Sequence, residues 1–238
     1  MSLVASNITK IFGKGHTAVK AVDDVSLNIL PGEVVLIMGP SGSGKTTLIT
    51  ILGGLLSPTE GLVVINHEDI TKLKENKLPK FRLDNIGFIF QSFNILSALN
   101  ATENVAVPLI ARGIGHKKAA EAAQDFLKRL GLGERLNNKP SDLSGGEKQR
   151  VAIARALVTN PSIILADEPT ANLDSKNGHE VMLKLCGVAC QENKSVTIVS
   201  HDQRIKDIAH RVLWIEDGKL TKEEEGNHKT VCPHENLV

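Results

Sequence analysis

Tyrosine is absent from this 238-residue sequence, and aromatic residues make up only 3% of it. A protein that stacks RNA bases on exposed aromatic rings needs more of them, so this class is disfavoured. The formal net charge is +1, without the basic excess that marks a nucleic-acid-binding surface. We therefore expect no nucleic-acid partner.

Cysteine is sparse, with Cys186, Cys190 and Cys232 as the only three. An odd and scattered set does not make a disulfide framework. Cys186 and Cys190 are four residues apart and can share one helix face, but no second pair of ligands stands near them. We interpret them as small helix residues in a reducing cytosol rather than as a metal site. Cys232, with His228 and His234, is a similarly weak metal candidate.

Long apolar runs are also missing, although the apolar content of 41% and the charged content of 23% are ordinary for a soluble globular protein. Stretches such as 34–38 and 163–166 are far shorter than the roughly 20 residues that cross a bilayer. The N-terminus has no basic region followed by an apolar core, so no signal peptide is visible. We expect a cytoplasmic protein that reaches a membrane only through a partner.

The distribution of apolar residues predicts alternating strands and helices. Strands are expected at 3–8, 18–29, 33–38, 61–66, 86–90, 162–166, 195–199 and 211–215, the first two as a hairpin. Helices are expected at 45–55, 102–130 with a break near 113–115, 147–158 and 175–191. Such alternation implies an α/β protein with a mostly parallel sheet wrapped by helices. We expect one domain over 1–222 and a charged, irregular tail over 223–238.

Residues 39–46 read Gly-Pro-Ser-Gly-Ser-Gly-Lys-Thr, a full phosphate-loop pattern between a buried strand and a helix. Backbone N–H groups of such a loop surround a phosphate, and the helix start adds partial positive charge. Lys45 is expected to reach the β- and γ-phosphates, Thr46 to bind Mg²⁺ and Thr47 to contact the α-phosphate. The expected nucleotide-binding residues here are Gly39, Ser41, Gly42, Ser43, Gly44, Lys45, Thr46 and Thr47. The motif predicts a nucleotide but no reaction, because kinases, GTPases and motor proteins share it.

Two acids, Asp167 and Glu168, follow the apolar run 163–166. Ligands of open α/β sheets lie at the carboxyl ends of strands, so both acids are expected to face the phosphate loop. Asp167 is expected to hold Mg²⁺, directly or through water. Glu168 is then free to polarise an attacking water. In the alternative, one acid caps a helix and the other is solvated; the neighbouring phosphate loop disfavours it.

Residues 143–147, Leu-Ser-Gly-Gly-Glu, are expected to begin a further helix. Together with this segment, the motifs over about 3–220 follow an order that resembles the ABC ATPase family. Phe12 is similar to the family's adenine-stacking aromatic, Gln91 to its Q-loop glutamine and His201 to its switch histidine. Residues 172–174 are similar to its D-loop, with Asp174 at the end. The signature residues are Ser144, Gly145 and Gly146. Several features in one order make the resemblance specific.

The resemblance implies an ATPase with a phosphate-loop NTPase fold: a mostly parallel core sheet, an antiparallel β-subdomain and a helical subdomain over about 92–160. It also implies that two chains close head to tail around two ATP molecules. The signature of one chain would bind the γ-phosphate held by the other, with Asp174 at the seam. His201 would contact the γ-phosphate, and Gln91 would touch Mg²⁺ or the water and sense a partner protein.

Two positions depart from the family pattern. Glu147 stands where the signature usually has glutamine. It either caps the helix start, which suits an acid, or weakens anion binding by its like charge. The aromatic is Phe12 and not the commoner tyrosine, so it keeps the stacking surface and loses a hydroxyl.

Residues 88–96, 100–109 and 166–175 are similar to the lipoprotein-releasing and macrolide-exporter branch of the family. This implies a subunit that drives a separate membrane permease at the inner face of the cell membrane, docking between 91 and 112. Phe93, Ile95, Leu96 and Leu99 are candidates for docking, the alternative being ordinary core residues. A related cell-division ATPase that signals without transport is the second interpretation. A soluble repair or translation ATPase is disfavoured, because the sequence has no coiled-coil insertion and no second cassette.

Overall fold

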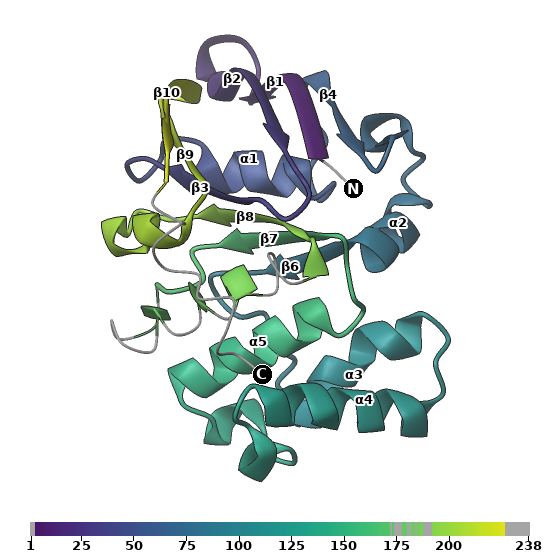
Figure 1. The fold of residues 1–238 in the computed structure, drawn as a ribbon. Coiled ribbons are helices and arrows are strands. Elements are labelled where there is room, and N and C mark those ends of the chain that lie inside the picture. Colours follow the sequence, from purple (N-terminus) through teal and green to yellow (C-terminus); the bar gives the residue numbers. More distant parts are fainter. Residues whose placement is uncertain are drawn as a thin grey trace.

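The computed structural model describes residues 3–171, 173, 178–179, 182–183, 185–187 and 192–226. Figure 1 shows three layers: an antiparallel sheet, a mixed sheet below it and a group of helices at the other end of the molecule. The helix expected over 175–191 lies largely outside the described residues, as do Asn172, Asp174, Cys190 and the segment 227–238. Cys186 is buried, consistent with a core residue.

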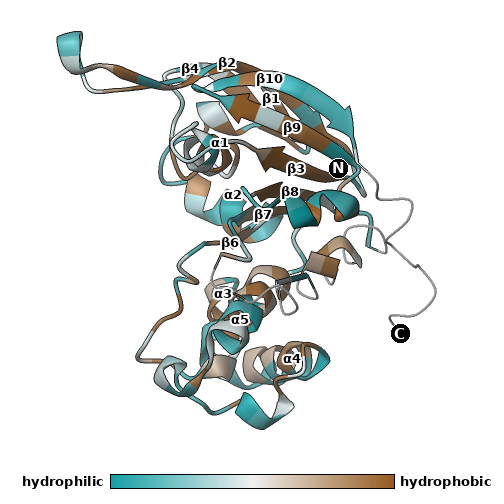
Figure 2. Ribbon diagram, turned by 90° about the vertical axis from the view of Figure 1, so that its left-hand side faces the viewer, coloured by the Kyte–Doolittle hydropathy of each residue, from teal (hydrophilic) through white to brown (hydrophobic). Residues whose placement is uncertain are grey.

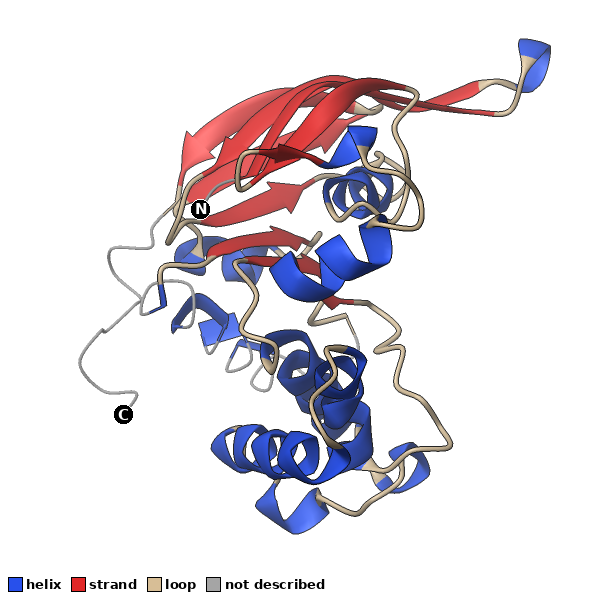
Figure 3. Ribbon diagram, turned by 90° about the vertical axis from the view of Figure 1, so that its right-hand side faces the viewer, coloured by secondary structure: helices blue, strands red, loops and turns tan. Residues whose placement is uncertain are grey.

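The antiparallel sheet has the strand order β2-β1-β4-β5. These strands are β1 (Leu3–Phe12), β2 (Val19–Ile29), β4 (Glu60–Ile65) and β5 (Glu68–Asp69). The expected hairpin is confirmed, since β1 and β2 pair antiparallel from Leu3 opposite Ile29 to Phe12 opposite Val19. Its tip, the 3-10 turn Gly15–Thr17, projects from the body of the protein, as Figure 3 shows.

The second sheet has the order β10-β9-β3-β8-β7-β6. Its strands are β3 (Val34–Met38), β6 (Ile86–Ile89), β7 (Ile163–Asp167), β8 (Ser195–Val199), β9 (Arg211–Glu216) and β10 (Lys219–Glu225). All neighbours are parallel except β9 and β10. Every residue of β3, β7 and β8 is buried, as expected for parallel strands covered on both faces. Figure 2 shows this apolar centre in brown.

The end of the second sheet corrects one prediction. Residues expected in an irregular tail from about 222 belong to β10, which continues to Glu225 as an antiparallel edge strand. Its acids find partners on β9: Arg211 Nε donates to Glu223 Oε1 at 2.7 Å, and Trp214 Nε1 to Glu224 Oε1 at 3.1 Å. Charged residues suit an exposed edge strand, so their presence does not indicate a frayed end.

Helix α1 (Lys45–Leu52) lies between the two sheets and buries Leu48, Ile49, Ile51 and Leu52. It ends before residue 55, the expected end, because the chain reaches Gly53 and then Gly54, which has φ of +61°. A second helix, α2 (Leu78–Asn85), was not predicted. Its polar sequence buries only Phe81, so it carries little of the periodicity on which the prediction depends.

The helical group consists of α3 (Ala101–Ala111), α4 (His116–Arg129) and α5 (Gly145–Leu157). The expected break is confirmed, with Gly113 at φ of +85°. Shorter 3-10 turns complete the described chain at Ile70–Lys72, Gly133–Arg135, Pro140–Asp142 and Gln203–Ile208. Within the described part of the chain, none of the helices has the length and apolar character that a bilayer crossing requires.

Asn104 of α3 fixes the connection that enters the helical group from β6. Its side chain is fully buried. Its Oδ1 accepts from the Leu96 N–H at 2.8 Å, and its Nδ2 donates to the carbonyls of Leu96, Leu99 and Asn100 at 3.0–3.1 Å. Buried polar groups of this kind stabilise only while all of them are satisfied.

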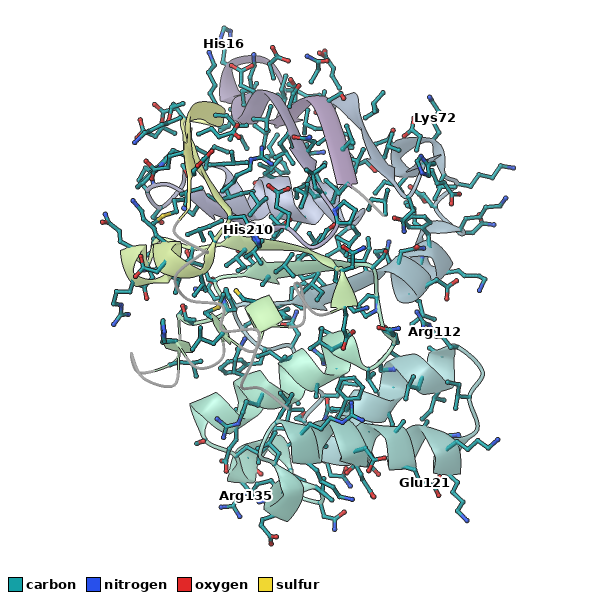
Figure 4. All side chains as sticks on the ribbon, in the orientation of Figure 1. His16, Lys72, Arg112, Glu121, Arg135 and His210 are labelled. Atoms are coloured by element: carbon teal, nitrogen blue, oxygen red, sulfur yellow. The ribbon has the colours of Figure 1, made fainter. Side chains whose placement is uncertain are left out.

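We predict that Asn104→Ala lowers the free energy of unfolding by about 2 kcal/mol, because it removes four hydrogen bonds of a buried side chain to partly buried backbone groups. Urea unfolding followed by circular dichroism measures the difference. Glu121→Ala, on the exposed face of α4 and labelled in Figure 4, is the matched control and should change the value by less than about 0.5 kcal/mol. Equal stability of the two variants would contradict the role given to Asn104.

Candidate active site

Three parallel strands bring the predicted site residues together at their carboxyl ends. In the register of the sheet, Ile37 of β3 lies opposite Val199 of β8, which lies opposite Asp167 of β7. Beyond the strands, the Ser200 N–H donates to the Ile37 carbonyl at 3.1 Å, and the Glu168 N–H donates to the Val199 carbonyl at 2.9 Å. The phosphate loop after β3 therefore begins beside both Glu168 and the residues that follow β8.

The phosphate loop requires glycine at two positions. A Cβ atom on Gly39 would collide with the Ile215 carbonyl, and one on Gly44 with the Ala21 carbonyl; Gly44 also has φ of +99°. The turn between β9 and β10 holds the loop from the side, where the Gly218 N–H donates to the Ser43 carbonyl at 3.0 Å. Close backbone approach on two sides fixes the loop in its curled form.

Lys45 places a buried ammonium inside this loop. The residue is 7% exposed, and Nζ donates to the carbonyls of Gly39 at 2.9 Å and Pro40 at 2.7 Å. Burial lowers the pKa of Lys45, and the charges of Glu168 and Asp167 oppose that shift. A cation surrounded by loop dipoles is suited to an anionic ligand such as a phosphate.

Asp167 and Thr46 form a pair of oxygen donors next to that ammonium. Asp167 is 6% exposed, and Thr46 Oγ1 donates to its Oδ1 at 3.2 Å. Burial raises the pKa of Asp167, Glu168 raises it further, and Thr46 and Lys45 work in the opposite direction. A buried carboxylate beside a hydroxyl is the hard-oxygen environment that Mg²⁺ prefers, so these residues fit the ion expected from the sequence.

Glu168 is held from two directions. Ser200 Oγ donates to its Oε2 at 3.2 Å, and His201 Nδ1 lies 2.8 Å from its Oε1. Its φ of +46° is a left-handed conformation that is uncommon for a non-glycine residue and often found at functional sites. Ser200 was not among the residues predicted from the sequence, although its place directly after a buried strand and before His201 was a usable signal.

These groups surround one cavity of about 440 Å³. Its lining consists of Ala21, Ser41, Gly42, Gly44, Lys45, Thr46, Thr47, Gln91, Glu168 and His201. Gly39 and Ser43 belong to the same loop, and Asp167 reaches the lining through its bond to Thr46. Phe12 is not part of this lining: it lies at the end of β1, 43% exposed, with Lys10 Nζ 5.3 Å from its ring centroid.

The signature forms a separate site at the start of α5. Ser144 is the N-cap: its Oγ accepts from the Glu147 N–H at 3.3 Å, and Glu147 Oε2 accepts from the Ser144 N–H at 2.8 Å. This capping box shows that the Glu147 carboxylate caps the helix start, the first of the two effects considered for it. The Ser144 N–H, and after it the guanidinium of Arg135, hold the pKa of Glu147 at about 2. Gly145 and Gly146 follow as the first residues of the helix.

An anion cradle next to two acids at strand ends is the arrangement of a phosphate-loop nucleotide hydrolase. Residues 22–171 match the ABC transporter family. The ABC transporter ATP-binding protein MJ0796 of Methanocaldococcus jannaschii is 46% identical over 222 residues, which cover 92% of this chain and 94% of that protein. The macrolide export ATP-binding/permease protein MacB of Wolinella succinogenes is 43% identical over 92% of this chain and 34% of its own length.

A further relative, the ABC transporter ATP-binding protein Rv2564 of Mycobacterium tuberculosis, is 45% identical over 89% of this chain, which spans only 64% of that protein. The dimeric structure of a post-hydrolysis state of the cassette MJ0796, bound to ADP and Pi, matches with a TM-score of 0.89 and 43% identity, over 94% of this chain and 98% of that chain. The chain therefore belongs to the ABC transporter family, as an ATP-binding and ATP-hydrolysing cassette. The predicted family, fold class and ATPase activity are confirmed.

We predict that Lys45→Ala abolishes measurable ATP binding, because it removes the buried ammonium that lines the cavity. Isothermal titration calorimetry of the purified chain with ATP measures the affinity, which should fall at least about a hundredfold. Lys117→Ala, an exposed lysine on α4, should bind ATP like the unmodified chain. Unchanged affinity of Lys45→Ala would refute the phosphate-loop assignment.

Proposed function

We propose that this cassette is the ATPase subunit of a transporter, in which ATP-dependent pairing of two cassettes drives a separate membrane permease that exports or extracts a substrate. The MacB relative is named as an ATP-binding/permease protein, and this chain covers only 34% of it. We infer one cassette domain that extends from the N-terminus through Glu225, with its helical subdomain over about 92–160. Its place would be the inner face of the cell membrane, through the permease.

We assign hydrolysis to Glu168, and the position of its carboxylate is the observation that carries the proposal. Its carboxylate lines the phosphate cavity and is oriented by Ser200 and His201, so it can accept a proton from a water that attacks the γ-phosphate. His201 would also contact that phosphate, and Lys45 would neutralise the charge it develops. Thr46, Asp167 and Gln91 would hold Mg²⁺, which would neutralise phosphate charge when bound.

Pairing of two cassettes is inferred from the separation of two anion sites. The signature residues Ser144, Gly145 and Gly146 lie outside the lining of the phosphate cavity, yet the start of α5 offers N–H groups suited to an anion. A second copy of the chain would bring its signature to the γ-phosphate, with Asp174 at the seam. The cassette MJ0796 has been solved as a dimer, which supports this arrangement.

Permease docking is inferred for the surface between α2 and α3. A groove of about 670 Å³ there is lined by Asn76, Pro79, Lys80, Leu83, Asp84, Ala111 and Arg112. Of the four predicted docking residues, Leu96 is 49% exposed, whereas Phe93, Ile95 and Leu99 are half-buried and Ile95 packs on the helical core. Leu96 is therefore the strongest docking candidate among them.

A half-buried arginine connects the segment that contains Phe93 and Asn94 to the signature helix. Arg155 of α5 donates from Nη1 to the Asn94 carbonyl at 2.6 Å and from Nη2 to the Phe93 carbonyl at 2.7 Å. Phe93 and Asn94 both have positive φ, at +61° and +48°, a conformation that needs support from its surroundings. A displacement of this segment by a permease would thus reach α5, and with it Ser144.

We predict that Glu168→Gln binds ATP but hydrolyses it at least about a hundredfold more slowly, because the amide cannot accept the proton. The variant should form a dimer when ATP is added, since the nucleotide persists. Size-exclusion chromatography with light scattering measures the mass, and phosphate release measures turnover. A second change, Ser144→Arg, should remove the dimer but not ATP binding by the monomer. A monomer that hydrolyses ATP at the unmodified rate would overturn both assignments.

We predict that Leu96→Asp lowers the recovery of the polytopic membrane protein that copurifies with the chain from detergent-solubilised membranes by about tenfold, the effect of losing one buried apolar anchor. ATP binding should not change, because Leu96 is not among the residues that line the cavity. Ile114→Asp, at an apolar residue that is 37% exposed, is the matched control and should retain the partner. Equal recovery with both variants, quantified by mass spectrometry, would contradict docking at Leu96.

A further inference from the structure

A carboxylate stands next to the group that is proposed to bind phosphate. Glu147 has a side chain only 18% exposed, and its Oε2 accepts from the N–H of Ser144 at 2.8 Å. Its other oxygen, Oε1, accepts from Arg135 Nε at 2.9 Å. The pKa of about 2 keeps Glu147 ionised at any pH near neutrality, so protonation does not remove its charge.

The charge of Glu147 has two opposite effects. It suits the start of α5, where the helix dipole is positive, and it completes the capping box with Ser144. It would also repel the γ-phosphate of a second chain's ATP, because like charges interact more strongly in a partly dry interface than in water. A glutamine amide oxygen would accept the same hydrogen bond without that repulsion.

Arg135 reaches Glu147 from an anchored position. It ends the 3-10 turn Gly133–Arg135, which follows Leu132, a fully buried residue of the helical core. Figure 4 labels Arg135 at the opposite end of the helical group from Arg112, so it is far from the groove assigned to permease docking. Its side chain remains 47% exposed.

We propose that Arg135 is a positioning residue for the signature: it neutralises Glu147 and holds the carboxylate on the Ser144 N–H, so that the Ser144 hydroxyl and the N–H groups of Gly145 and Gly146 remain available to the partner chain's ATP. This inference rests on the proposed pairing of two cassettes. The cation is needed only because residue 147 is an acid, and this dependence makes the role testable.

The experiment measures the ATP concentration that half-maximally dimerises the hydrolysis-deficient Glu168→Gln chain. Adding Arg135→Gln should raise that concentration about fivefold, the size expected for a partly exposed ion pair. Adding Glu147→Gln as well should restore it to within about twofold, since the charge to be neutralised is gone. Arg135→Lys should fall between, because it keeps the charge and loses the planar donor geometry.

Two further readouts separate positioning from mere support of the fold. The melting temperature and the ATP affinity of the monomer should not change with Arg135→Gln, and Arg129→Gln on the exposed face of α4 should leave dimerisation unchanged. Unchanged dimerisation with Arg135→Gln, or no recovery with Glu147→Gln, overturns the inference and leaves the pairing intact. If the Glu168→Gln parent stays monomeric with ATP, the pairing itself is overturned, and the inference falls with it.

Discussion

The buried ammonium of Lys45 is the constraint around which the site is arranged. A charge in this position is tolerated only with close partners, and the chain supplies them in two ways. The carbonyls of Gly39 and Pro40 accept its hydrogen bonds, while Asp167 and Glu168 favour its charged form through space. The hydrogen bonds to the carbonyls require a loop that curls onto itself, and hence glycine at the positions that Ile215 and Ala21 approach closely. The nearby carboxylates require parallel strands whose carboxyl ends meet.

The same constraint explains why the acids lie on one strand end and the histidine on the next. Asp167 is buried and turned to Thr46, whereas Glu168 turns toward Ser200 and His201. In a regular strand, adjacent side chains point to opposite faces of the sheet. Glu168 instead has a left-handed backbone, so that it and Asp167 have different surroundings without lying on opposite faces. One acid therefore lies beside a hydroxyl oxygen and the other lines the cavity, which is the arrangement that the proposed roles in metal binding and water activation require.

The sequence predicted the parts of this fold in which local pattern and tertiary environment agree. Runs such as 34–38 and 195–199 are apolar because both faces of the sheet are covered, and the phosphate loop has a spacing that few other structures share. The sequence did not predict α2, which buries only Phe81, or β10, where Glu223 pairs with Arg211 of the neighbouring strand. It also missed Ser200, although its place directly after a buried strand was a usable signal, and Arg135, whose contact with Glu147 joins two separate elements and carries no local pattern.

Glu147 shows how a site can accept a residue that its chemistry disfavours. The cap that Glu147 forms is local and could be predicted from its spacing after Ser144. The cation that neutralises Glu147 is Arg135, twelve positions earlier. The buried Leu132 anchors the turn that carries Arg135. Capping and anion binding compete for the same helix start. A carboxylate satisfies the first and opposes the second, so its charge must be balanced from outside the helix. The proposed anion site thus depends on two segments, the start of α5 and the turn that carries Arg135, and the five signature residues belong only to the first.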